Sequence, residues 1–188
     1  MVNNAGFGLR GGFADLPLDR QMAIAEVNMT ALTSLTGVFL PQMLKRRRGG
    51  IINVASIAAF LPGPFMSVYY ASKAYVLSFS EAIACEAKAS GVVVTALCPG
   101  ATHSEFAQVA GFAFPKRARR AIMTAKEVAR LGLEGHRAGK RVVITGAANK
   151  LIVGVSRFIP RGLLLGLSSA VQRNALRTPA PTRADSAT

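Results

Sequence analysis

Apolar residues along this chain fall into two kinds of segment, and each kind predicts a different secondary structure. Short, continuous runs rich in Val and Ile are typical of buried strands, whereas longer segments with apolar positions spaced by three and four residues are typical of amphipathic helices. The expected strands are residues 2–6, 51–55, 92–97 and 141–145. The expected helices are residues 18–44, residues 67–89 and a third that starts after Thr124 and ends near Gly135 or Gly139.

Residues with special backbone preferences mark the ends of these segments. Asp15 and Pro17 are suited to the start of the first helix, and Gly91 is suited to the C-cap of the second. Thr124 and Glu127 have the spacing of a capping box at the start of the third. A loop is expected at residues 56–64, and another at residues 102–115, so the chain alternates strand, loop and helix.

This alternation predicts an α/β fold with a parallel sheet. Ligands of such sheets bind beyond the carboxyl ends of the strands, so chemistry is expected in the loops that follow them. Those loops begin at Asn4, at Ser56 and at Pro99.

The last part of the chain has a different pattern. Residues 151–176 are strongly apolar, Pro160 is expected to split them into two helices, and residues 178–188 are expected to be disordered. Arginines lie four apart in the pairs Arg157 and Arg161, and Arg173 and Arg177, which places each pair on one helical face. Such a segment either lies on an anionic membrane surface or packs on the body or across a dimer interface.

The net charge of +14, from 23 Lys and Arg against 9 Asp and Glu, favours anionic partners such as phosphorylated cofactors or anionic lipid. Nucleic acid is not expected, because no nucleic-acid-binding motif is visible. Cys85 and Cys98 lie in apolar runs and are expected to be buried free thiols, which favours a reducing cytoplasm. The start, MVNNAG, lacks the features of a signal peptide, and no metal-ligating pattern is expected.

One candidate for chemistry is the pair Tyr69 and Lys73 in the stretch SVYYASK. At i and i+4 on a helix the two side chains share one face. An ammonium next to a phenol lowers the pKa of the phenol, which makes it a better proton donor and acceptor near neutral pH. The neighbouring Tyr70 has no such partner, because the residue four positions further on is Ala74.

Other residues place this pair in a wider pattern. Ser56 follows the strand IINVA, Pro99 and Gly100 end the next strand, and NNAG at residues 3–6 ends the first. Asn28 lies inside the first long helix, where Asn is a poor helix former. In their order and spacing these motifs resemble the short-chain dehydrogenase/reductase family, and the resemblance covers about residues 2–146.

The resemblance implies a role for each matched residue. Asn28, Ser56, Tyr69 and Lys73 would be catalytic: Tyr69 as general acid or base, Lys73 as its partner and a donor to the nicotinamide ribose, Ser56 on the substrate oxygen, and Asn28 holding a water of the proton relay. The cofactor, NADP(H) or NAD(H), would contact Asn4, Ala5, Gly6, Tyr69, Lys73, Pro99, Gly100, Thr102 and Ser104. The positive charge slightly favours NADPH. The partner would be a small carbonyl or alcohol. Phe106, Phe112 and Phe114 suggest an apolar substrate, but core packing explains these residues as well. The protein would form a homodimer or homotetramer in the cytoplasm.

The family's pattern also begins with a glycine-rich turn, TGxxxGxG, which this sequence lacks. The expected fold is therefore the C-terminal part of a doubly wound, Rossmann-like sheet without the first βαβαβ unit. The expected organisation is a partial catalytic domain at residues 1–146, a helical extension at 147–177 and a disordered tail at 178–188. Two alternatives stay open beside the oxidoreductase: a non-catalytic fragment or pseudoenzyme that cannot bind cofactor, and a basic membrane-surface or scaffold protein.

Overall fold

The computed structural model describes residues 1–111 and 122–176. The predicted tail, Phe112, Phe114 and Arg177 lie outside the described residues. The centre of the fold is a parallel sheet with the strand order β1-β2-β3-β6. Its strands are β1 (Val2–Asn3), β2 (Gly49–Val54), β3 (Val92–Cys98) and β6 (Val142–Ile144). This sheet confirms the prediction of an α/β fold with parallel strands.

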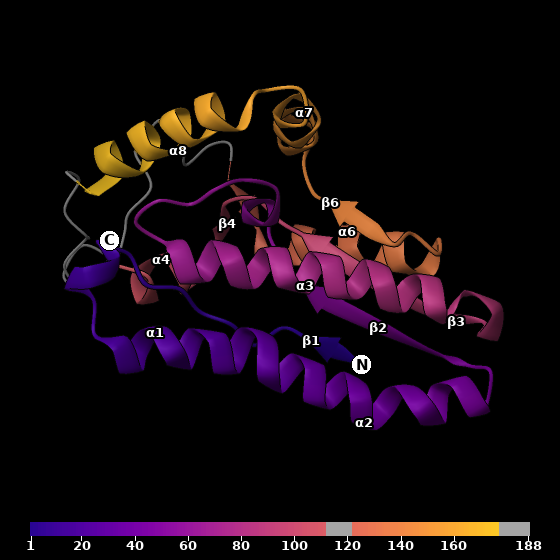
Figure 1. Ribbon diagram of the computed structural model, residues 1–188. Helices are drawn as coiled ribbons and strands as arrows, with labels where there is room; N and C mark the ends of the chain where they lie inside the picture. Colours follow the sequence, from indigo (N-terminus) through magenta and orange to yellow (C-terminus); the bar gives the residue numbers. More distant parts are fainter. Residues whose placement is uncertain (112–121, 177–188) are drawn as a thin grey trace.

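Helices cover both faces of the sheet, as the doubly wound prediction requires (Figure 1). On one face, Val76 and Leu77 of α3 (Ser67–Glu86) pack against Ala96 and Cys98 of β3. On the other face, Val128 of α6 (Ala125–Arg137) packs against neighbouring strands. Alternate residues of β3 point to opposite faces, so its continuous apolar run, VVVTALC, supplies both layers of the core.

The predicted helix at residues 18–44 is one continuous helical rod with a change of winding in its middle. It consists of α1 (Leu18–Ala25), a π-helical turn η2 (Glu26–Ala31) and α2 (Leu32–Lys45). By length and composition this rod is apolar enough to cross a membrane. One stripe of it, which includes Leu32 and Met43, is buried against the sheet and α3.

The predicted ends of several elements differ from the observed ones. The helix expected to run to residue 89 ends at Glu86, and a 3-10 turn, η4 (Lys88–Ser90), carries the chain to Gly91. Gly91 has a φ of 73°, the left-handed conformation that glycine adopts without strain. The strand β2 begins at Gly49, two residues before the predicted start, because Gly49 and Gly50 also pair with β3.

The two predicted loops contain short ordered elements, namely η3 (Ile57–Phe60), β4 (Thr102–His103) and α4 (Phe106–Val109). Two more short elements, η1 (Phe13–Asp15) and β5 (Met123–Thr124), lie just before α1 and α6. The strands β4 and β5 pair in parallel and form a small second sheet. The capping box of α6 is confirmed: the Thr124 hydroxyl accepts from the Glu127 N–H, and the Glu127 carboxylate accepts from the Thr124 N–H.

The C-terminal segment forms two helices, α7 (Ala147–Ser156) and α8 (Arg161–Leu176), separated at Pro160 as predicted. The expectation that Arg157 and Arg161 share one helical face is wrong. Arg157 is the C-cap of α7 and Arg161 is the first residue of α8, because the proline interrupts the helix between them.

The expectation that both cysteines are buried is half correct. Cys98 is buried at the end of β3, whereas Cys85 is exposed. Cys85 lies near the end of α3, off the buried stripe that includes Val76, Ser80 and Ala84. The residues of an apolar run on a half-buried helix are therefore not all buried.

Candidate active site

Three segments meet at one edge of the sheet, beyond the carboxyl ends of adjacent parallel strands. Asn4, Ala5 and Gly6 follow β1, Ser56 follows β2, and Pro99 follows β3. The first of these segments is exposed, and the other two are partly exposed. The backbone links two of them, because the Ile57 N–H donates to the Pro99 carbonyl at 2.9 Å.

Tyr69 points from α3 toward Ser56. Its side chain is only 9% exposed, and its ring lies 5.0 Å from the ring of Phe106, measured between centroids. Burial raises the pKa of Tyr69 to about 12, and a side-chain hydrogen bond with Ser56 works in the opposite direction. The phenol is therefore neutral at neutral pH, which is the form that can donate a proton.

Lys73 lies one helical turn further along α3 and is buried. Its ammonium donates to the Val54 carbonyl at 2.7 Å, and Nζ lies 5.8 Å from the centroid of the Tyr69 ring. Burial lowers the pKa of Lys73 to about 8. The expectation that Lys73 lowers the pKa of Tyr69 is wrong for this structure, because burial of the phenol dominates and the ammonium is bound to a carbonyl.

Asn28 reaches the same place from the π-helical turn and is 1% exposed. Its Oδ1 accepts from the Phe7 N–H, and its Nδ2 donates to the Phe7 carbonyl, both at 3.1 Å. The same Nδ2 donates to the Ser72 hydroxyl at 2.9 Å, and that hydroxyl donates to the Tyr69 carbonyl at 2.7 Å. These bonds tie the loop after β1 to α3 and give the buried amide its partners.

Close contacts leave little room for a side chain at two glycines of the loop after β1. A Cβ on Gly6 would lie 3.0 Å from Asn28 Oδ1 and 3.2 Å from Lys73 Nζ. A Cβ on Gly8 would lie 3.1 Å from the Tyr69 ring. The loop therefore passes directly over the buried Asn28, Tyr69 and Lys73, and its small residues leave the outer side open to a bound molecule.

The loop after β3 forms the opposite side of this opening. The Thr102 hydroxyl donates to the Gly100 carbonyl at 3.0 Å, and Ser104 is exposed. Gly100 packs so closely on Asn149 of α7 that a Cβ there would overlap the Asn149 side chain. Of the predicted site residues, Ser104 stays at the surface, whereas Asn28, Ser56, Tyr69 and Lys73 come together.

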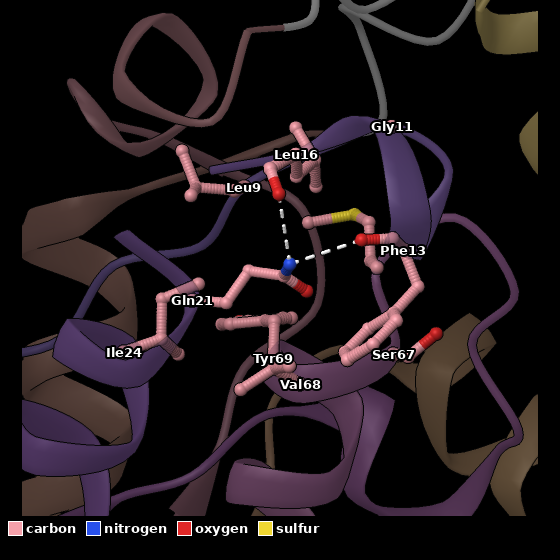
Figure 2. Close-up of a pocket in the computed structure, with 10 residues that line it drawn as sticks. Leu9, Gly11, Phe13, Leu16, Gln21, Ile24, Ser67, Val68 and Tyr69 are labelled. Atoms are coloured by element: carbon pink, nitrogen blue, oxygen red, sulfur yellow. Dashed lines mark hydrogen bonds between the residues drawn. The ribbon is translucent and has the colours of Figure 1, made fainter. Parts of the chain in front are cut away.

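A small pocket adjoins Tyr69 and extends between the loop after β1 and the start of α3 (Figure 2). Most of its lining is apolar, including Leu9, Leu16, Ile24 and Met66. The buried Gln21 closes one side, because its Nε2 donates to the carbonyls of Phe13 and Leu16, at 3.0 Å and 3.2 Å. A molecule held beside Tyr69 would meet an apolar wall here.

The structure also shows contacts that the sequence analysis did not find. Ser72 connects Asn28 to Tyr69, and the Val54 carbonyl binds Lys73. Ser72 lies in the same stretch as Tyr69, so its place one turn along the helix was a usable signal. No sequence signal pointed to the Val54 carbonyl, because every residue at the end of a strand has a backbone carbonyl.

A family model described as "short chain dehydrogenase" matches residues 1–111. A ketoacyl reductase, HetN, of Nostoc sp. is 34% identical over 134 residues, which cover 66% of this chain and 47% of that protein. Dehydrogenase/reductase SDR family member 7B of Rattus norvegicus is 36% identical over 104 residues, covering 55% of this chain and 32% of that protein. The chain thus spans about half or less of the length of these curated relatives.

Two solved structures have the same fold over most of the chain. A short-chain dehydrogenase from Sphingobium yanoikuyae in complex with NADPH has a TM-score of 0.71 at 31% identity, over 83% of this chain and 61% of that one. A short chain dehydrogenase/reductase from Burkholderia phymatum in complex with NAD has a TM-score of 0.69 at 27% identity, over 81% of this chain and 62% of that one. These similarities confirm that the sheet and its helices are Rossmann-like.

Proposed function

Because the chain belongs to the short-chain dehydrogenase family, we propose that it is an oxidoreductase that uses NADP(H) or NAD(H) to interconvert a carbonyl compound and a secondary alcohol. The observation that carries the proposal is the buried group of Ser56, Tyr69, Lys73 and Asn28 at the carboxyl edge of a parallel sheet. Relatives of the same fold bind NADPH and NAD, which supports the choice of cofactor.

In the proposal the cofactor lies on the open side of this group. Small residues line the place where it would lie, and a side chain at Gly6 would enter the space beside Asn28 and Lys73. In the proposal the cofactor contacts Asn4, Ala5, Gly6, Tyr69, Lys73, Pro99, Gly100, Thr102 and Ser104. When bound, it supplies or takes up the hydride.

Tyr69 is the proposed acid and base. Its phenol is neutral at neutral pH, so it can donate a proton to the substrate oxygen as the carbonyl is reduced, and the phenolate takes a proton back in the reverse direction. Ser56 is hydrogen-bonded to Tyr69 and is proposed to hold and polarise the same oxygen. A substitution of Tyr69 would therefore remove the proton donor and leave the binding site in place.

Lys73 and Asn28 have supporting roles in the proposal. The Lys73 ammonium, fixed by the Val54 carbonyl, has further N–H donors for the ribose of the cofactor. Asn28 holds the loop after β1 against α3, and its Oδ1 keeps a second lone pair for a water of the proton relay. Asn28 is thus a positioning residue.

The substrate is proposed to be a small molecule with an apolar group next to its carbonyl. The ring of Phe106 and the apolar side chains near Tyr69, among them Leu9 and Met66, support this class. The proposed organisation stays as expected: a partial catalytic domain at residues 1–146, a helical extension at 147–177 and a tail at 178–188. The proposed location is the cytoplasm, with contact to anionic membrane through the extension.

A homodimer or homotetramer is also proposed. Exposed apolar side chains gather on α2 and α3, namely Leu35, Val38, Phe39 and Tyr75. Tyr75 stacks on Phe79 and hydrogen-bonds to Thr33 at 2.7 Å, so α3 and the long helical rod present one joined surface. Association of two copies through this surface would remove it from water.

Binding of the cofactor tests the proposal most cheaply. Titration of the 188-residue chain with NADPH and NADH in a calorimeter should give saturable binding of at least one of them. Gly6→Val is a suitable comparison, because its side chain would enter the space beside Lys73 and should weaken binding. If neither NADPH nor NADH binds, the oxidoreductase proposal for this chain is overturned and a non-catalytic role is left.

A further inference from the structure

The helices α7 and α8 carry a large apolar surface that the described part of the molecule leaves uncovered. Eight large apolar side chains of this segment are exposed: Leu151, Ile152, Val155, Phe158, Leu163, Leu165, Leu167 and Val171. Phe158, in the turn between the helices, is 88% exposed. Monomeric soluble proteins rarely expose a continuous apolar patch of this kind unless it binds a partner or a membrane.

The outward face of α8 is regular. Leu163, Leu167 and Val171 follow one another at four-residue spacing and form one exposed stripe. The neighbouring stripe, Leu164, Ser168 and Gln172, is partly buried and faces the body of the protein. Packing on the body therefore uses one side of α8 and leaves the most apolar side free.

The charge around this surface is of one sign. Between Gly135 and Leu176 the sequence contains no Asp or Glu, whereas Lys150, Arg157, Arg161 and Arg173 lie on or next to the two helices and are exposed. Among the described residues, the one ion pair lies elsewhere, between Arg130 and Glu134. These cations therefore remain available to an anionic partner.

The charge distinguishes between two possible partners of this surface, a second copy of the chain and an anionic lipid bilayer. In a symmetric dimer the same patch meets itself, so a second copy would bring these arginines against their own equivalents. The sequence of α3, unlike those of α7 and α8, contains acidic residues, namely Glu81 and Glu86. An anionic bilayer satisfies both features of α7 and α8, since its headgroups attract Lys and Arg and its acyl region accepts Leu, Val and Phe.

We infer that α7 and α8 form a docking surface for an anionic lipid bilayer. The Leu163–Leu167–Val171 stripe and Phe158 enter the boundary between headgroups and acyl chains, and Arg157 and Arg161 bind lipid phosphates or carboxylates. This inference is independent of the proposed oxidoreductase activity, because it concerns helices outside the buried group at Tyr69.

Docking would place the candidate active site close to the membrane. The Gln172 side chain of α8 donates to the Tyr70 hydroxyl at 2.8 Å, and Arg10 donates to the Gln172 carbonyl at 2.9 Å. Arg173 lies over the ring of Phe65, 5.9 Å from its centroid. The helix that faces the lipid is thus attached to residues near Tyr69.

Co-sedimentation with vesicles tests the inference. The full 188-residue chain should pellet with phosphatidylcholine vesicles that contain phosphatidylserine, and added salt should reduce the bound fraction because it screens the arginines. Pure phosphatidylcholine vesicles should bind it at least about tenfold more weakly. Equal binding to both kinds of vesicle, or no binding to either, would overturn the inference.

Two variants and a matched control locate the surface. Leu163→Ser with Leu167→Ser and Val171→Ser should abolish pelleting, and Arg157→Gln with Arg161→Gln should weaken it about tenfold or more. Leu18→Ser with Met22→Ser removes equally exposed apolar side chains from α1 and should bind like the unchanged chain. The same loss in this control would contradict a surface at α7 and α8.

Two further measurements keep the result interpretable. Circular dichroism and urea unfolding should show that each variant is folded. If the serine variant is unfolded, the arginine variant tests the surface in its place. Sedimentation velocity without lipid should give the same mass for the serine variant and the unchanged chain. A lower mass for the serine variant would show that a second copy covers the surface, and would overturn the lipid inference.

Discussion

At the scale of single residues, burial controls the chemistry of the candidate site. It raises the pKa of Tyr69 and lowers that of Lys73, because a buried group is disfavoured in its charged form. The sequence was sufficient to choose Tyr69 over Tyr70, since the choice depends only on helical spacing. It was not sufficient to predict the pKa of Tyr69, which depends on burial and on the carbonyl that Lys73 binds.

Lys73→Met tests the burial of this ammonium through the pH dependence of stability. The folded-state pKa of Lys73 is about 8, lowered from 10.5, so between these values the unfolded chain binds a proton that the folded chain has lost. Stability of the unchanged chain should therefore rise with pH across this window. Lys73→Met should remove that rise and should be more stable by about 2 kcal/mol at neutral pH, because the cost of the buried charge exceeds the lost hydrogen bond.

Urea unfolding across this pH range measures the effect. Lys88→Met, at an exposed position beyond α3, is the control and should keep the pH dependence of the unchanged chain. If the stability of Lys73→Met still rises with pH as it does in the unchanged chain, another group titrates in this pH range.

At the scale of elements, the contacts of Asn28 explain the change from α-helical to π-helical winding in the long helix. The π-helical turn holds Asn28 where its amide bonds both backbone groups of Phe7 and the Ser72 hydroxyl. Hydrophobic spacing predicted the helix itself, and the weak helix preference of Asn indicated that position 28 was special. The winding could not be predicted, because it depends on partners distant in the sequence.

Asn28→Ala tests this account of the turn. The substitution leaves the partly buried N–H and carbonyl of Phe7 and the buried Ser72 hydroxyl without their side-chain partner, so the free energy of unfolding should fall by about 2–4 kcal/mol. Thr30→Ala is the matched control in the same turn, and because Thr30 is exposed its effect should stay within about 0.5 kcal/mol. Equal effects of both substitutions in chemical denaturation would mean that Asn28 is not what holds the loop after β1.

Sequence patterns predicted the elements better than their ends. The capping box at Thr124 was visible because both partners lie within one helical turn. The short strands β4 and β5 were not predicted, because they are two residues each and exist only through their pairing. The Arg157–Arg161 pair was placed on one helix because spacing alone does not show how Pro160 redirects the chain.

At the scale of the whole molecule, the sheet order β1-β2-β3-β6 brings the three strand-end loops to one edge. The alternation of strands and helices predicted that edge, and the family resemblance implied that Ser56, Tyr69 and Lys73 meet there. Contacts of α8 could not be predicted in this way. Gln172 and Tyr70 are 102 residues apart in sequence, and no periodic pattern connects them.

The proposed oligomer makes a prediction at this scale. Val38→Asp with Phe39→Asp places carboxylates on the exposed apolar surface of α2 and should convert the oligomer to a monomer, because burying two unpaired charges is costly. Phe158→Ser, in the turn before α8, should leave the mass unchanged. Sedimentation velocity distinguishes the outcomes, and an unchanged mass of the aspartate variant would contradict an interface on α2.

The central claim is that Tyr69 is the proton donor of a nicotinamide-dependent reduction. The most direct test is the rate of NADPH or NADH oxidation with an apolar ketone, compared between the unchanged chain, Tyr69→Phe and Tyr70→Phe. We expect kcat/KM to fall about a hundredfold to ten-thousandfold in Tyr69→Phe, because the proton donor is lost. Tyr70→Phe, which removes only the hydroxyl bonded to Gln172, should stay near the unchanged value. Equal rates in Tyr69→Phe and the unchanged chain would contradict the claim.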